Sequence, residues 1–114
     1  NALRNFMLST TDALDFLIKL PTASVTAAYT ATGGDYTILA DASTGAFTVT
    51  LPLASPNINK VYVIKKVDSS ANAITVATTN SETVDGSTTQ TISSQADSKT
   101  IKSKGTSWYI IETK

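Results

Sequence analysis

Carboxylates and aromatic rings are the side chains of this sequence whose chemistry could act on a ligand. Asp35, Glu82 and Glu112 are acids without an evident local role, and a pair of carboxylates is all that glycoside hydrolysis requires. The Asp residues after position 40 lie in turn signals, where Asp bonds its own backbone; they are Asp41, Asp68, Asp85 and Asp97. Because no spacing marks two acids as a working pair, we expect that the protein is not an enzyme.

Two tyrosines flank a glycine pair and are candidates for stacking on a sugar ring. Tyr29 and Tyr36 lie on either side of Gly33 and Gly34, with an acid beside the second tyrosine. The predicted ligand-binding residues are therefore Tyr29, Asp35 and Tyr36. Trp108 lies in a stretch that is apolar on both faces, so we expect it in the core or an interface, and not as a sugar platform.

Composition disfavours other kinds of site. The chain has no His and no Cys, which excludes zinc sites built on imidazole or thiolate and His-dependent nucleophilic catalysis. Nine Lys+Arg balance nine Asp+Glu, whereas a nucleic-acid binder needs a basic face. Asp85-Gly86-Ser87 lacks the alternating ligands and distal Glu of a calcium loop. We expect no metal, no cofactor and no nucleic acid. We also expect no membrane insertion, because no apolar run approaches the roughly 20 residues of a membrane span.

A helical segment followed by strands must position these residues. Apolar residues between Ala2 and Leu20 recur every three or four positions, which suits a helix, and Pro21 ends it. From about Val25 the period becomes two, with turn signals roughly every 10 residues. The stretch from Thr22 to Gly34 is the nearest thing to a linker. Five lysines are read as solvated strand faces or protection of strand edges; they are Lys65, Lys66, Lys99, Lys102 and Lys104.

These patterns predict an all-β fold: an antiparallel, jelly-roll-like β-sandwich of seven or eight strands with a short N-terminal helical segment. The run "AFTVTL" alternates with Phe47, Val49 and Leu51 facing inward, and "KVYVIKKV" reads as a central strand. The expected parts are a helical segment over residues 1–24 and a β-sandwich over residues 25–114.

The order of strands and turns resembles a known module. The pieces "FTVTLP", "IKKVDSSANAITV", "ETVDGS" and "GTSWYII" are similar to a small β-sandwich near the C-termini of bacteriophage tail fibres, tailspikes, baseplate receptor-binding proteins and related bacterial fibre adhesins. The likeness spans about Tyr36 to Ile111. It implies a homotrimeric tip domain, on a virion tail or an extracellular or cell-surface fibre, that binds a bacterial surface saccharide.

The resemblance also implies a helical stalk that joins three copies. Alternating four- and three-residue steps form an a/d seam, and this predicted trimer interface consists of Leu3, Met7, Thr10, Leu14 and Leu17. The alternative is an amphipathic helix folded on its own β-domain. Two other functions stay open beside the receptor-binding tip: a non-binding trimerisation or spacer module, and a monomeric carbohydrate-binding module.

Overall fold

The computed structural model describes residues 20–114, and these residues form nine β-strands and one short 3-10 helix. The strands are β1 (Thr22–Val25), β2 (Tyr29–Thr30), β3 (Thr37–Ala40), β4 (Phe47–Thr50), β5 (Val61–Lys66), β6 (Ile74–Ala77), β7 (Thr89–Ile92), β8 (Ser98–Ser103) and β9 (Trp108–Thr113), and the helix η1 spans Ser55–Asn57. The all-β prediction is confirmed for this part of the chain. The predicted helical segment and its trimer seam lie outside the described residues.

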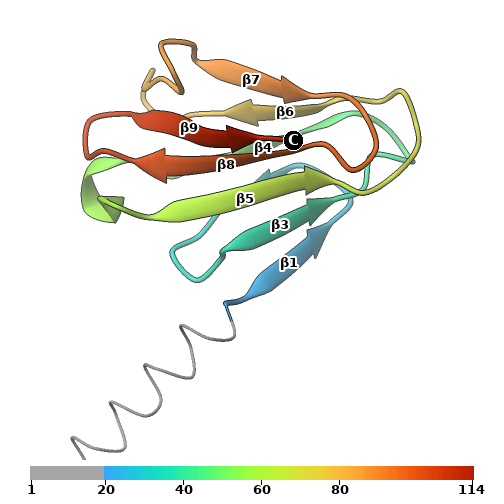
Figure 1. Ribbon diagram of the computed structural model, residues 1–114, viewed down its shortest axis with the longest axis horizontal. Helices are drawn as coiled ribbons and strands as arrows, with labels where there is room; N and C mark the ends of the chain where they lie inside the picture. The colour runs from blue at the N-terminus through green and yellow to red at the C-terminus, as the bar shows by residue number, and fades with distance from the viewer. Residues whose placement is uncertain (1–19) are drawn as a thin grey trace, which may run out of the picture.

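The strands are divided between two sheets that share one core. The five-stranded sheet has the order β1-β3-β5-β8-β9, and the four-stranded sheet has the order β2-β4-β6-β7. Figure 1 shows the first sheet in front of and below the second. The stretch from Thr22 to Gly34, expected to be a linker, instead supplies the first strand of each sheet.

From β1 to β6, each strand lies in the opposite sheet from the strand before it. As a result β1, β3 and β5 pair in parallel, and so do β2, β4 and β6. This part of the chain winds as a coil in which each turn adds one strand to each sheet. The last three strands then pair antiparallel: β7 on β6, β8 on β5, and β9 on β8.

The prediction of an antiparallel, jelly-roll-like arrangement is therefore wrong. Among the strand pairs of residues 20–114, four are parallel and three are antiparallel. The reason is that side chains alternate with the same period of two in both kinds of strand. A turn signal marks where a strand ends, but it does not show whether the next strand returns in the same sheet or crosses to the other.

Inward-facing side chains from both sheets form the hydrophobic core. Val49 and Leu51 are fully buried and Phe47 packs against the core from its edge, as the alternation in "AFTVTL" predicts. β5 lies between β3 and β8, which confirms its reading as a central strand. Trp108 is 1% exposed and its ring centroid lies 5.7 Å from that of Tyr62, which confirms its place in the core.

Two predicted turns have the backbone geometry that their residues favour. Asp85 and Gly86 both have positive φ, 49° and 82°, and Val84 bridges Ser87 across them, as in a two-residue hairpin turn. Gly105 has a φ of 95° in the turn between β8 and β9, where the Lys104 amide donates to the Ser107 carbonyl over 3.0 Å. Both segments are turns, as the sequence indicates.

The strand directions define two ends of the β-structure. β1, β3 and β5 all run away from the end at which Leu20 lies (Figure 1). The near end, beside Leu20, therefore carries the loops 31–36, 51–60, 78–88 and 104–107. The far end carries the loops 26–28, 41–46, 67–73 and 93–97.

Candidate functional site

The structure brings together two of the three predicted ligand-binding residues, at the near end. The Tyr29 hydroxyl at the start of β2 donates to Asp35 Oδ2 over 2.6 Å. The same carboxylate oxygen accepts from the Thr32 amide over 2.9 Å and from the Thr32 hydroxyl over 3.2 Å. Asp35 is buried. These contacts hold the 31–36 loop closed on itself, and they give Tyr29 and Asp35 a structural role.

Two further hydrogen bonds tie the same loop to β5 and to the residue just before it. The Tyr62 hydroxyl donates to the Thr32 carbonyl over 2.7 Å, and the Lys60 ammonium donates to the Asp35 carbonyl. Lys60 Nζ also lies 4.9 Å from the centre of the Tyr62 ring, within the range of a cation–π contact. The 31–36 loop is thus a fixed connection between the two sheets.

The electrostatics of this cluster follow from its burial and its one carboxylate. The hydrogen bond to Asp35 raises the pKa of Tyr29, with burial adding to the effect. Burial raises the pKa of Tyr62 to about 12, and the negative charge of Asp35 contributes. Burial lowers the pKa of Lys60, against the opposing pull of Asp35. Both tyrosines therefore stay protonated at neutral pH and act as hydrogen-bond donors.

Tyr36, the third predicted residue, does not join this cluster. No hydrogen bond within residues 20–114 links its side chain to Tyr29 or Asp35. Its amide donates to the Pro21 carbonyl over 3.2 Å, as does the amide of Thr37 over 3.1 Å. Tyr36 is half-buried beside the point where the chain enters β1. Tyr36 is therefore not part of the hydrogen-bonded cluster of Tyr29 and Asp35.

The other acids singled out in the sequence are also occupied or isolated. Both oxygens of Glu82 accept from the Ala54 amide, over 3.0 and 3.2 Å, which fixes the segment before η1. Glu112 is exposed and lies 3.2 Å from the Lys114 ammonium. Across residues 20–114, no three acidic side chains gather into a group that could hold a metal ion.

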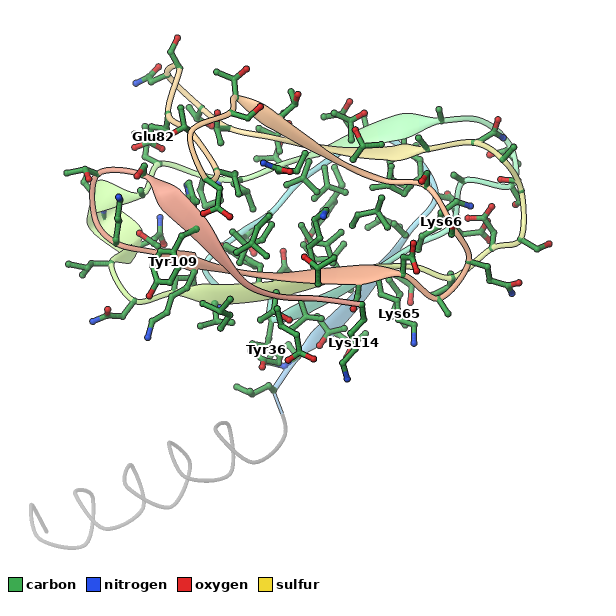
Figure 2. The ribbon with its side chains drawn as sticks, turned by 45° about the horizontal axis from the view of Figure 1, so that its top comes forward. Tyr36, Lys65, Lys66, Glu82, Tyr109 and Lys114 are labelled. Atoms are coloured by element: carbon green, nitrogen blue, oxygen red, sulfur yellow. The ribbon has the colours of Figure 1, made fainter. Side chains whose placement is uncertain are left out.

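A buried ion pair organises the far end. Lys66 is fully buried, and its ammonium lies 2.7 Å from Asp68 Oδ2. Figure 2 shows Lys66 between the two sheets and its neighbour Lys65 on the outer side of the five-stranded sheet. The prediction that Lys66 lies on a solvated strand face is wrong, because side chains alternate along β5 and Lys66 takes the inward position at its end.

The carboxylate of this pair also joins two loops. Asp68 Oδ1 accepts from the Ala42 amide over 2.7 Å, and Oδ2 accepts from the amide and the hydroxyl of Ser70. The Asn72 amide group donates to the Ala42 carbonyl over 2.8 Å. The Lys66 ammonium and the Ser70 hydroxyl lower the pKa of Asp68 well below its usual range. The 41–46 and 67–73 loops are therefore held together as one rigid unit.

A shallow hollow of about 470 Å³ lies beside this unit at the far end. The 26–28 loop and the 44–46 turn form its walls together with the first residues of β4, Phe47 and Thr48. Parallel pairing of β1 with β3 and of β2 with β4 places the two turns side by side. A smaller crevice of about 50 Å³ at the same end is lined by charged residues, including Asp97, Lys99 and Lys114.

Sequence reasoning did not identify the residues of the larger hollow. Its walls consist of Thr, Ala and Gly, which are individually unremarkable, and of one half-buried aromatic residue. The available signal was the shared composition of "TAA" at 26–28 and "TGA" at 44–46. That similarity is informative only once the two turns are known to be neighbours.

Within residues 20–114, the structure contains no helix long and apolar enough to span a membrane. No protein-family model matches the chain. A comparison with curated proteins likewise finds no match.

Proposed function

We propose that the chain is the tip domain of a homotrimeric fibre protein, a bacteriophage tail fibre or a bacterial fibre adhesin, that attaches to a saccharide of the bacterial cell surface. The observation that supports the proposal is that the chain enters the β-structure at one end and has four loops at the opposite end. The chain enters β1 at the near end, whereas the loops 26–28, 41–46, 67–73 and 93–97 gather at the far end. A stalk that precedes Leu20 would therefore present these loops outward.

The chemistry of the described residues supports binding over turnover. Asp35 and Glu82, the acids considered for glycoside hydrolysis, are each held by backbone amides as part of a loop. Inverting and retaining glycosidases need two carboxyl groups on either side of the scissile bond. Attachment requires only contact, and three weak sites on one trimer gain strength when they engage together.

A purely structural trimerisation module is the second candidate. It is favoured by the way the near end uses its polar groups internally, since Tyr29, Asp35 and Tyr62 all bond within the fold. This reading predicts the same trimer but no saccharide binding.

Binding of the labelled chain to whole bacteria and to immobilised bacterial polysaccharides tests the proposal. We expect saturable binding that is lost when the glycans are oxidised with periodate. The molar mass by light scattering should be three times the 12.0 kDa of the chain. A trimer that binds no cell and no polysaccharide would favour the structural module, and a monomer that binds sugar would favour a monomeric carbohydrate-binding module.

A further inference from the structure

The hollow at the far end has no charged residue in its lining. Its polar groups are the hydroxyls of Thr26, Thr44 and Thr48, and its largest side chain is Phe47. Charged groups of this end lie outside the lining: Asp97, Lys99 and Lys114 line the small crevice. Asp41 accepts a hydrogen bond from the Ser43 amide over 2.9 Å. Lys66 and Asp68 neutralise each other beneath the loops.

The three hydroxyls are available to a ligand. No hydrogen bond within residues 20–114 engages the side chains of Thr26, Thr44 or Thr48, whereas the hydroxyls of Thr78 and Thr79 are used to hold loops. Small residues keep the hollow open, because Ala27, Ala28 and Ala46 have no side-chain atoms beyond Cβ to fill it.

From these features we infer that the hollow binds one neutral pyranose unit of a surface saccharide. A pyranose has an apolar face that suits the half-buried Phe47 ring and a rim of hydroxyls that can exchange hydrogen bonds with Thr26 and Thr44. The carboxylate of a uronic or sialic acid would find no cation to pair with in this lining. This inference rests on the proposed function and names the sugar class and the place of contact.

Nuclear magnetic resonance of the full, ¹⁵N-labelled chain tests the site directly. The probes are methyl β-D-glucopyranoside, methyl β-D-galactopyranoside and N-acetylglucosamine, with glucuronic acid as the charged counterpart. We expect at least one neutral sugar to shift the amide resonances of residues 26–28 and 44–48. Glucuronic acid should bind no more tightly than the neutral sugars, because the lining offers its carboxylate no cation.

A pair of matched variants separates this site from the rest of the far end. Ala46 and Ala71 are both exposed far-end alanines, but only Ala46 lines the hollow. Ala46→Trp should fill the hollow and weaken sugar binding by about tenfold or more, whereas Ala71→Trp should change it by less than about twofold. The inference is overturned if no neutral sugar shifts these resonances, if Ala46→Trp binds as the unaltered chain does, or if glucuronic acid binds more tightly than every neutral sugar.

The cell-binding assay distinguishes failure of the site from failure of the proposed function. If the unaltered chain binds bacteria and Ala46→Trp binds them equally, the hollow is not the contact and the attachment function stands. If a neutral sugar binds at residues 26–28 and 44–48 but the chain binds no bacterium or polysaccharide, the site stands and the attachment function fails.

Discussion

The buried ion pair of Lys66 and Asp68 fixes the arrangement of two loops at the far end of the β-structure. A buried ammonium is costly to leave unpaired, and here its partner also accepts hydrogen bonds from the loops 41–46 and 67–73. The pair therefore does more than neutralise charge, because it fixes the positions of two loops relative to each other.

Because the pKa of Asp68 is lowered in the folded chain, the free energy of unfolding should decrease at acidic pH. The Lys66 ammonium and the Ser70 hydroxyl hold this pKa below the value of about 3.9 expected in the unfolded chain. The stabilisation is fully present above about pH 5 and is lost as the pH falls below the unfolded value toward the folded one. We expect urea midpoints to fall in this acid range for the unaltered chain.

Asp68→Asn should lower the midpoint at pH 7 and flatten its decline in acid, since the pair with Lys66 is already lost. Asp41→Asn is the matched control, because Asp41 lies in the same end and only accepts from the Ser43 amide over 2.9 Å. If the urea midpoint of Asp68→Asn declined in acid as steeply as that of the unaltered chain, the pair of Lys66 and Asp68 would not be the cause of the acid dependence.

At the scale of the elements, β1 is the feature that most distinguishes this fold from an antiparallel one. The carbonyls of Pro21 and Val25 accept hydrogen bonds from the Thr37 and Asp41 amides, over 3.1 and 2.9 Å. In a parallel pair, alternate residues point their backbone groups toward the same neighbour. The backbone amide and carbonyl of Ala23 therefore face β3, whereas the backbone amide of Ser24 points away from the sheet.

Proline substitutions at these adjacent positions test the pairing. Ala23→Pro removes a ladder donor, whereas Ser24→Pro removes an amide that faces outward, where an edge strand tolerates proline. We expect Ala23→Pro to reduce the free energy of unfolding by at least about 1 kcal/mol more than Ser24→Pro. Urea denaturation provides the measurement, and a larger loss for Ser24→Pro would contradict the register of β1 on β3.

The sequence predicted the strands better than their connections. "KVYVIKKV", "AFTVTL" and the turns at Gly86 and Gly105 were recognisable because alternation and positive φ leave local traces. β1 and β2 were missed because Thr22 to Gly34 is rich in small and polar residues. Their place in the sheets comes from pairing with β3 and β4, which is a non-local property.

The same distinction explains the outcome for the candidate site. Tyr29 and Asp35 were grouped as ligand-binding residues because they lie close to Gly33 and Gly34, but closeness in the sequence does not show that the two side chains bond to each other. The hollow was not predictable, because its walls come from turns separated by 15 or more residues and meet only through parallel pairing.

At the scale of the whole molecule, the proposed trimer depends on residues ahead of the described β-structure. Replacing Leu14 and Leu17 together by Asp would place unpaired charge in the predicted a/d seam. We expect the molar mass by light scattering to fall from that of a trimer to that of a single chain, and binding to cells to weaken because the three sites no longer act together.

Asn5→Asp combined with Lys19→Asp is the matched control for this experiment. These positions fall outside the seam in the same heptad register, so two acids introduced there should leave the trimer intact. A Leu14→Asp, Leu17→Asp variant that remains trimeric would assign the contact between copies to the β-structure.

The direction of β1 has a mechanical consequence. If the far end is anchored to a cell and the chain is pulled from Leu20, the force runs along β1 and parallel to its neighbour β3. The hydrogen bonds between β1 and β3 lie across that direction. The force therefore shears all of them at once and does not break them one after another. A β-structure pulled along β1 should withstand a force that would separate β1 from β3 if it were applied sideways to the strand.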